Sequence, residues 1–437
     1  MTTTAIILAA GLGTRMKSAL PKTLHPIAGR PMLNHLLDSA SQVFERIVVV
    51  LGPDMEQVAA AAAPHAVIVQ HERLGTAHAA LQAEALFGDG EVAVLYADNP
   101  LISPDTLRRL LARRAEGDAG LALLAMRPAD PGRYGRVLTE GGYVTDIVEY
   151  ADADADQRAI GLCNAGVLCA EAGVMRQWLR AVRNDNNKGE YYLTDLVKLA
   201  RALGYAVVAV EAPADELRGV NSREELADAE ASTQRALRRA AMAAGVTLMA
   251  PETVFFTHDT RIAADVTVEP HVVFGSGVVI ETGARIRAFS HLEGCHVGPS
   301  AIIGPYARLR SGTTVGRAAH VGNFVELKAT SLGDGAKANH LSYLGDSSIG
   351  AHTNIGAGTI TCNYDGFTKH RTTIGEAVFV GTASVLVAPL TLGDGAFTAA
   401  GSVITQDVAA NAMAFARAPQ IDKPGRAAAF RAARSKT

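Results

Sequence analysis

The sequence is poor in the residue types that build wide aromatic cores and cross-linked frameworks. Aromatic residues make up 5% of its 437 residues, and there is 1 tryptophan. The four cysteines, Cys163, Cys169, Cys295 and Cys362, form no CxxC pair and lack the histidine spacing of a zinc site. A disulfide scaffold and a zinc module are therefore excluded. We expect the cysteines to be small core residues in a reducing compartment.

Charge and hydrophobic runs exclude two further classes. The formal net charge is −3, which argues against a general nucleic-acid-binding protein. No apolar stretch approaches the length of a membrane span, and the N-terminal MTTT lacks the basic and apolar parts of a signal peptide. We expect a cytoplasmic protein with neither a membrane nor a nucleic-acid partner. The basic tail over 417–437 either meets a phosphorylated ligand or stays solvated.

The first half of the chain alternates short apolar runs with stretches of helical pattern. Up to about residue 220 the runs are RIVVVLG, AVIVQ, EVAVLYAD, AGLALLAM and AVVAV. This order predicts a mostly parallel sheet covered by helices, with ligands bound outside the carboxyl ends of the strands. Because the chain is longer than is usual for a protein with a single hydrophobic core, we expect two domains.

The loop after the first apolar run combines glycine with positive charge. Gly11 and Gly13 are followed by basic residues that include Arg15 and Lys22. The third glycine of a dinucleotide fingerprint and the Gly-Lys-Ser/Thr of a Walker loop are missing. The loop is either a cradle for a polyphosphate or an ordinary turn with solvated basic residues. Asp98 follows EVAVLY at the same predicted edge, a place that suits a carboxylate binding a hard metal ion.

The second half changes its period. A segment that begins with Ser222 and Glu225 in capping-box spacing and stops at Gly245 predicts a helix over 222–245. Aliphatic residues then recur every six positions, which indicates a parallel β-helix of about eight coils. Breaks in the period near 293, 328–349 and 362–373 predict loops. The series runs Ile262, Val268, Phe274, Ile280, Ile286 and Leu292, then Val297, Ile303, Leu309, Val315, Val321 and Leu327.

Motifs in both halves carry a family resemblance. The first half contains LAAGLGTRM…LPK, QHERLGTAHA, RYGRV, IVEY, CNAGV, GEYYLTD and GVNSR, and the second contains ARLR, HVGNFVELK, NHLSYLGD, NIGAGTITCNYDG and VFVG. The chain resembles the bifunctional bacterial N-acetylglucosamine-1-phosphate uridyltransferase/glucosamine-1-phosphate acetyltransferases. The resemblance implies an α/β protein with a Rossmann-like uridyltransferase domain over 1–221, a linker helix over 222–245 and a left-handed β-helix acetyltransferase domain over 246–437.

By this resemblance the first half joins UTP to N-acetylglucosamine 1-phosphate and releases pyrophosphate, a step that supplies peptidoglycan and lipopolysaccharide precursors. Arg15 and Lys22 are expected to offset charge that grows on the leaving group. Asp98 and Asn221 are expected to bind Mg²⁺. The matching substrate-binding residues are Leu8, Ala9, Ala10, Gly11, Lys22, Gln70, Gly75, Thr76, Tyr96, Ala97, Asp98, Gly135, Glu149, Asn164 and Asn221.

One motif departs from the family pattern. Where the family usually has Tyr-Gly-Asp-Val-Pro, this chain has YADNP, with Ala97 for glycine and Asn99 for valine. Asp98 is kept, so we expect metal binding to be kept. The methyl group of Ala97 is expected beside the metal ligand, where it bears on the fit of the nucleotide. A thymidylyl or adenylyl transferase therefore stays open.

By the same resemblance the second half transfers acetyl from acetyl-coenzyme A to the amino group of glucosamine 1-phosphate. His340 is the expected general base, because imidazole changes charge near neutral pH and can accept the proton that the amine must lose. Arg310 and Lys328 are expected to clamp the sugar phosphate, and Tyr343 and Asn354 to place the sugar. The matching acetyl-coenzyme A contacts are Ala357, Asn363, Tyr364, Thr382, Ala400 and Arg417.

The resemblance also implies a homotrimer. One alternative remains, because hexapeptides specify shape and not chemistry: the β-helix could be the oligomerisation module of a monofunctional sugar-nucleotide pyrophosphorylase. The bifunctional interpretation is favoured by four residues that a purely structural β-helix would not need: Arg310, Lys328, His340 and Tyr343.

Overall fold

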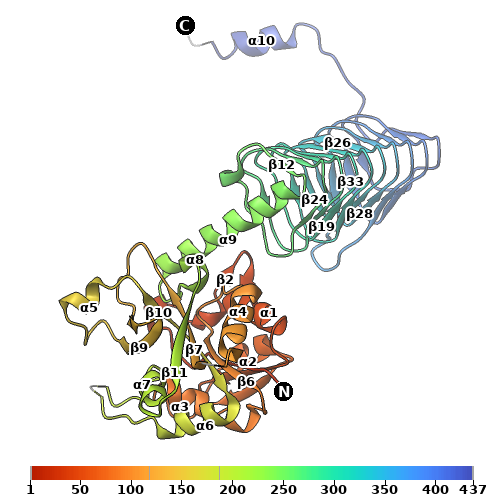
Figure 1. The fold of residues 1–437 in the computed structure, drawn as a ribbon. Helices are drawn as coiled ribbons and strands as arrows, with labels where there is room; N and C mark the ends of the chain where they lie inside the picture. Colours follow the sequence, from red (N-terminus) through yellow and green to blue (C-terminus); the bar gives the residue numbers. More distant parts are fainter. Residues whose placement is uncertain (1, 118, 187, 436–437) are drawn as a thin grey trace. The chain divides into compact units, whose positions relative to one another are not determined.

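The computed structural model describes residues 2–117, 119–186 and 188–435. The chain forms two compact units, residues 1–235 and 236–437, each with its own hydrophobic core (Figure 1). None of the helices in the described ranges has the length and apolar character needed to cross a membrane.

A nine-stranded mixed sheet forms the centre of the first unit. The strand order is β11-β7-β10-β6-β1-β4-β5, with β8 and β9 attached through β10. Strand β1 runs parallel to both of its neighbours, whereas β10 is antiparallel to β6 and β7, so the predicted, mostly parallel sheet is confirmed. The strands are β1 (Thr4–Leu8), β4 (Arg46–Leu51), β5 (Ala66–Val69), β6 (Glu91–Tyr96), β7 (Ala119–Met126), β8 (Arg136–Glu140), β9 (Tyr143–Val148), β10 (Cys163–Glu171) and β11 (Ala206–Glu211); β2 (Pro26–Ile27) and β3 (Arg30–Pro31) form a separate ribbon.

Helices cover both faces of this sheet, because neighbouring residues of a strand point to opposite sides. Ile7 of β1 packs in one buried cluster with Leu36 of α1 (Met32–Ser41), and Ile6 packs in another with Trp178 of α6 (Ala172–Ala181). The other helical elements are η1 (Thr14–Met16), η2 (Lys22–Leu24), α2 (Glu56–Ala62), α3 (Thr76–Leu81), η3 (Glu84–Leu86), α4 (Pro104–Ala115), α5 (Ala155–Ala159), α7 (Asp195–Ala202) and α8 (Ala214–Leu217).

The long helix expected after Ser222 is present as α9 (Arg223–Ala243). The predicted capping box is formed, because Ser222 N donates to Glu225 Oε2 at 2.9 Å and Glu225 N donates to Ser222 Oγ at 3.1 Å. Gly245 follows the helix with a positive φ of 93°. The capping box therefore defines the start of this helix, and a glycine with positive φ follows its end, as the sequence predicted.

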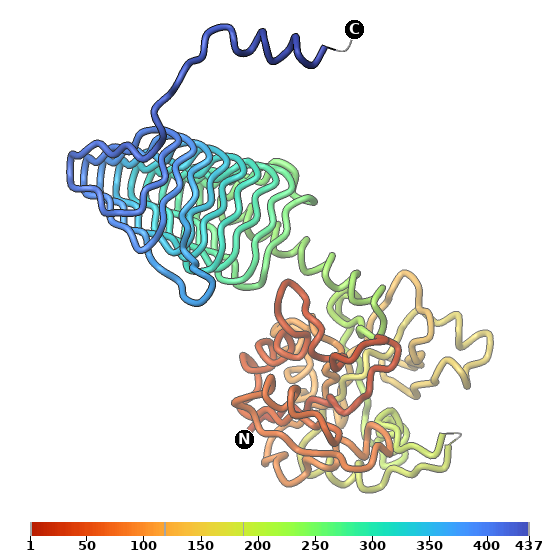
Figure 2. The backbone as a smooth tube through the Cα atoms, turned by 180° about the vertical axis from the view of Figure 1, so that it is seen from behind, coloured from red at the N-terminus to blue at the C-terminus, as the bar shows by residue number. Residues whose placement is uncertain are grey.

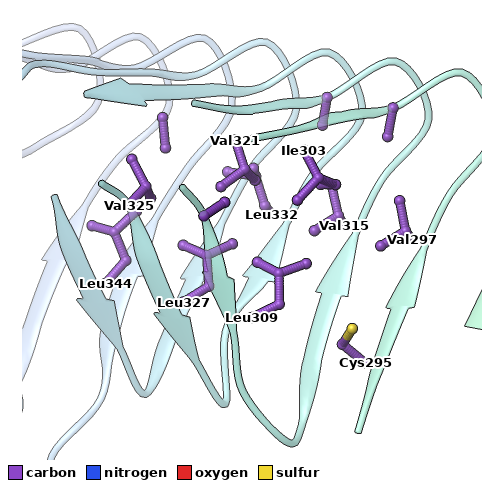
Figure 3. Close-up of a cluster of buried hydrophobic side chains, with 14 of the residues drawn as sticks. Cys295, Val297, Ile303, Leu309, Val315, Val321, Val325, Leu327, Leu332 and Leu344 are labelled. Atoms are coloured by element: carbon purple, nitrogen blue, oxygen red, sulfur yellow. The ribbon is translucent and has the colours of Figure 1, made fainter. Parts of the chain in front are cut away.

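The second unit is a left-handed parallel β-helix made of three sheets of short strands. Figure 2 shows its stacked coils. Each coil contributes one strand to each sheet, and the six-residue period places one aliphatic side chain per strand in the core. Leu309, Leu327 and Leu344 stack in one such column, and Val297, Val315 and Leu332 in another (Figure 3). The hexapeptide prediction is confirmed by this register.

The first of the three sheets contains β12 (Thr247–Leu248), β14 (Thr267–Val268), β17 (Arg285–Ile286), β20 (Ile302–Ile303), β23 (His320–Asn323), β26 (Lys337–His340), β29 (Asn354–Ile355), β32 (Phe379–Val380), β35 (Phe397–Thr398) and β37 (Met413–Ala414). The second contains β13 (Arg261–Ile262), β16 (Val279–Ile280), β19 (Cys295–Val297), β22 (Thr313–Val315), β25 (Ser331–Leu332), β28 (Ser347–Ile349), β31 (Thr372–Ile374) and β34 (Leu390–Leu392). The third contains β15 (Val273–Phe274), β18 (His291–Leu292), β21 (Arg308–Leu309), β24 (Glu326–Lys328), β27 (Tyr343–Gly345), β30 (Ile360–Cys362), β33 (Val385–Val387) and β36 (Val403–Ile404). The unit also contains η4 (Pro251–Thr253) and α10 (Arg426–Ala432).

Two of the three breaks in the period are not loops, and the expectation for them was wrong. Val321 pairs with Ala338 where Ile303 pairs with Val321, so the coil at 328–349 is one residue shorter than the preceding one. The break near 293 is a shortening of the same kind. Ala338, the inward residue of the shorter coil, is fully buried. The break at 362–373 does form a loop, which joins β30 to β31.

Candidate active sites in the two units

A cleft lies over the carboxyl end of β1, where the sequence predicted a ligand site. Its floor is the chain after β1, and its walls come from the segment at 70–79 and from the end of β6. The predicted residues that it brings together are Leu8, Ala9, Ala10, Gly11, Lys22, Gln70, Gly75, Thr76, Tyr96 and Asp98. Thr23, Arg73, Ala79 and Glu190 complete the lining.

One side chain of this cleft links three distant segments. Lys22 Nζ donates to Asp98 Oδ2 at 2.5 Å and to Asn221 Oδ1 at 3.0 Å. Its stem passes over Gly13, where a Cβ atom would lie 2.5 Å from Lys22 Cβ, so this residue must be glycine. The carboxylate and amide oxygens therefore converge on one cationic group. This donor set fits Mg²⁺, which takes one or two carboxylates and completes its shell with water and substrate phosphates.

The backbone holds Asn221 against the end of β6. Val220 N donates to Asp98 O at 2.8 Å, and Asn221 N donates to Glu225 Oε2 at 2.6 Å. Asn99 is buried, and its Nδ2 donates to Leu217 O at 2.6 Å. The asparagine of YADNP thus ties the strand end to the segment that carries Asn221.

The methyl group of Ala97 does not lie beside the metal ligand as the sequence suggested. Ala97 is 1% exposed and belongs to the core cluster that contains Ile7 and Leu95. Its neighbours Tyr96 and Asp98 face the cleft instead, because alternate residues at a strand end point to opposite sides. Burial raises the pKa of Tyr96.

A second cleft adjoins the first and shares Thr76, Tyr96 and Glu190 with it. Glu149 and Asn164, two of the expected substrate-binding residues, line it. Gly135 lies beside Glu149, since a Cβ atom there would be 3.6 Å from both carboxylate oxygens. Burial raises the pKa of Glu149, and Lys188 opposes part of this effect. The remaining lining residues are Arg133, Tyr150, Ala151, Asp152, Lys188, Tyr192 and Thr194.

In the β-helix, the ends of two paired strands bring His340 and Asn323 together. His340 ends β26 and Asn323 ends β23, and the two residues are in register. His340 Nδ1 lies 2.8 Å from Asn323 Oδ1. Because the amide oxygen can only accept, this contact places the proton on Nδ1 and leaves the Nε2 lone pair for a substrate. His340 is exposed, as a base that meets a substrate must be.

A carboxylate directly after β27 binds two further expected residues. Asp346 accepts two hydrogen bonds from Lys328 Nζ, both at 2.9 Å, and one from Asn363 Nδ2 at 2.5 Å. Burial acts to raise the pKa of Asp346, but the bonds from Lys328 and Asn363 outweigh it and hold the pKa below its usual range. The same pairing raises the pKa of Lys328. A Cβ atom at Gly345 would lie 2.5 Å from the Tyr343 hydroxyl and 2.9 Å from Asn363 Nδ2, so these groups also meet there.

The other residues expected to contact the acetyl donor and acceptor lie at successive coils. Ala383 N donates to Ala357 O, and Gly401 N donates to Thr382 O, so Ala357, Thr382 and Ala400 occupy corresponding turns. Arg310 Nη1 donates to Glu326 Oε1 at 3.0 Å. Asn354 begins β29, Tyr364 is exposed on the loop after β30, and Arg417 is exposed beyond β37. Arg417 is thus not brought to the others by a strand of the stack.

Comparisons with known proteins agree with this two-site architecture. The MobA-like NTP transferase domain model matches residues 5–187. Three curated proteins, each named "Bifunctional protein GlmU", match almost the whole chain. That of Gluconacetobacter diazotrophicus is 68% identical over 98% of this chain and 94% of its own length. That of Acidiphilium cryptum is 62% identical over 100% of both, and that of Granulibacter bethesdensis is 64% identical over 98% and 96%.

The chain belongs to the GlmU family. It is a bifunctional transferase of UDP-N-acetylglucosamine synthesis, as the sequence motifs predicted. The nucleotidyltransferase domain model covers residues 5–187 of the α/β unit, whereas the relatives cover the β-helix as well. Membership of the GlmU family therefore supports the bifunctional interpretation and not a monofunctional pyrophosphorylase with an inert β-helix.

Within this GlmU family member, the linings of the two clefts leave out some of the predicted residues and include others that sequence reasoning missed. Arg15 is exposed on η1 and lines neither cleft. Arg73 and Glu190 line the first cleft, and Asn323 contacts His340, but none of the three was selected. Each lies inside a quoted motif, QHERLGTAHA, GEYYLTD or HVGNFVELK. A charged or amide side chain within a matched motif was thus the signal that could have found them.

Proposed function

We propose that residues 1–221 carry out uridylyl transfer and that residues 246–437 carry out acetyl transfer. The observation that carries the first assignment is the convergence of Lys22, Asp98 and Asn221 in one cleft. The observation that carries the second is the pairing of His340 with Asn323 at the open end of two strands. The product of acetyl transfer, N-acetylglucosamine 1-phosphate, is the acceptor in uridylyl transfer.

In the first cleft, the chain must align two anions and stabilise a departing pyrophosphate. Gln70, Gly75 and Thr76 bind uracil, and Glu149 and Asn164 hold the sugar in the adjoining cleft. Asp98 and Asn221 hold Mg²⁺, which neutralises phosphate charge when it is bound. Lys22 moves from the carboxylate toward the phosphates as the ligands arrive. The shared wall of Thr76, Tyr96 and Glu190 supports this assignment, because acceptor and nucleotide must meet there.

On the β-helix, His340 Nε2 accepts a proton from the amino group of glucosamine 1-phosphate, and the amine attacks the thioester of acetyl-coenzyme A. The amide bond forms as the carbon–sulfur bond breaks, and coenzyme A leaves as the thiol with the proton that His340 returns. Asn323 fixes the tautomer. Lys328 and Arg310 bind the sugar phosphate, and donors near Asn363 and Tyr364 stabilise the developing oxyanion. Ala357, Thr382, Ala400 and Arg417 contact the coenzyme. We also infer that the protein acts as a homotrimer in the cytoplasm; the exposure of His340 supports a groove completed by a second copy.

A one-pot assay tests both assignments. Purified protein receives glucosamine 1-phosphate, acetyl-coenzyme A, UTP and Mg²⁺, with each component omitted in turn and the products read by mass spectrometry. We expect UDP-N-acetylglucosamine only in the complete mixture. Formation only from ready-made N-acetylglucosamine 1-phosphate would contradict the assignment of His340. Preferential use of another nucleoside triphosphate would contradict the assignment of UTP.

A further inference from the structure

Arg73 is a cationic residue of the first cleft that the assignments above leave without a role. It lies on the segment that carries Gln70 and Gly75, and it lines the cleft together with Gly11 and Lys22. The inference about Arg73 rests on the proposed uridylyl transfer in this cleft.

The guanidinium of Arg73 bridges the ends of two neighbouring strands. Its Nε donates to Ala10 O at 2.9 Å, just after β1. A Cβ atom at Gly52, just after β4, would lie 2.3 Å from Nη2 and 2.9 Å from Cζ. Strands β1 and β4 pair in parallel, so both contacts are at the carboxyl edge of the sheet. The missing side chain of Gly52 therefore leaves the space in which the guanidinium lies.

The charge of Arg73 is not committed to a carboxylate. Lys22 is paired with Asp98, and Arg15 lies outside the cleft lining. Within the described ranges, no carboxylate forms an ion pair with Arg73. A triphosphate brings several negative charges into the cleft, and a guanidinium binds phosphate oxygens through a planar set of donors. With Nε held by Ala10 O, the Nη atoms of Arg73 remain to meet such a ligand.

We propose that Arg73 is a phosphate-binding residue for the nucleotide. Its guanidinium binds the phosphate chain of UTP on the β4 side of the loop after β1, opposite Lys22 on the β6 side. The bond to Ala10 O fixes this guanidinium and joins the base-binding segment to the phosphate-binding loop.

Three variants of the full chain test the proposal by titration calorimetry with UTP and, separately, with uridine. R73Q removes the charge, and R73K keeps the charge but lacks the planar set of guanidinium donors. G52A displaces the guanidinium without changing the charge. We expect R73Q to weaken UTP binding about tenfold or more, in line with the loss of a charge-assisted bond. R73K and G52A should weaken it less. Uridine affinity should change less than twofold in all three, and this retained uridine binding serves as the folding control for the α/β unit.

Equal losses for UTP and uridine would assign the guanidinium to the base and overturn the proposal. Unchanged UTP affinity in R73Q would overturn it as well. If the wild-type protein itself binds no UTP, both this inference and the proposed uridylyl transfer fail; if wild type binds UTP and R73Q does so equally, the inference alone fails.

Discussion

The two units build their sites over very different distances along the chain. In the α/β unit, Lys22 meets side chains 76 and 199 residues away. In the β-helix, His340 meets Asn323 across 17 residues and Lys328 meets Asp346 across 18, about one coil. A solenoid makes neighbours of residues at the same place in successive coils, whereas the α/β site requires the whole sheet to form. The two sites should therefore be damaged independently.

The largest effect should follow from His340→Ala. Removing the proton acceptor should lower the rate of acetyl transfer by roughly 10²–10⁴-fold, the usual contribution of a general base. Uridylyl transfer from ready-made N-acetylglucosamine 1-phosphate should stay within twofold of wild type, because its residues lie in the other unit. Both rates are measured on one preparation, with Asn323→Ala as a milder variant that loses one hydrogen bond. A parallel fall in both activities would show that the units are coupled.

The converse experiment changes the cleft of the α/β unit and leaves the β-helix unchanged. Asp98→Asn should lower uridylyl transfer by about 10²-fold or more, since Lys22 loses its carboxylate partner and the proposed Mg²⁺ site loses a ligand. Chelation with EDTA should have the same selective effect on the wild-type protein. Acetyl transfer should persist in both cases, because its groups are His340, Lys328 and their neighbours. Loss of acetyl transfer on chelation would contradict the separation of the two chemistries.

A smaller effect is expected from Asp346→Asn, which frees Lys328 and Asn363. The KM for glucosamine 1-phosphate should rise about tenfold, as for one charge-assisted contact, while the KM for UTP should not change. The lowered pKa of Asp346 means that its contribution to stability is present above about pH 4 and is lost as pH falls through the folded pKa. The raised pKa of Lys328 keeps its contribution below about pH 10. Urea unfolding should thus show a constant difference between wild type and variant from about pH 5 to 9, which shrinks in acid.

What the sequence could predict follows from the same contrast. The six-residue period of the inward hydrophobic residues, such as Ile303 and Val321, places each β-helix residue in its coil, because each coil contacts only its two neighbours in the stack. It could not tell a shortened coil from a loop at 328–349, since both break the period. In the α/β unit, strand runs predicted the sheet, but the bond from Lys22 to Asn221 depends on a closure of 199 residues that no local pattern encodes. The family motifs named Lys22 and Asn221 as site residues, whereas the bond between them and the place of Arg73 come from the structure.

The smallest effect concerns Ala97, where sequence and structure disagree. A methyl group beside the metal ligand would make Ala97→Gly change the KM for UTP or the Mg²⁺ requirement. The structure places this methyl group in the core with Ile7, so the variant should leave both unchanged. It should instead lower the free energy of unfolding by about 1 kcal/mol, because glycine at a strand end costs backbone entropy and the core loses a methyl group. Urea unfolding and UTP kinetics on the same sample separate the two outcomes. A changed KM with unchanged stability would return Ala97 to the nucleotide site and contradict the assignment of Ala97 to the core and of its neighbours Tyr96 and Asp98 to the cleft.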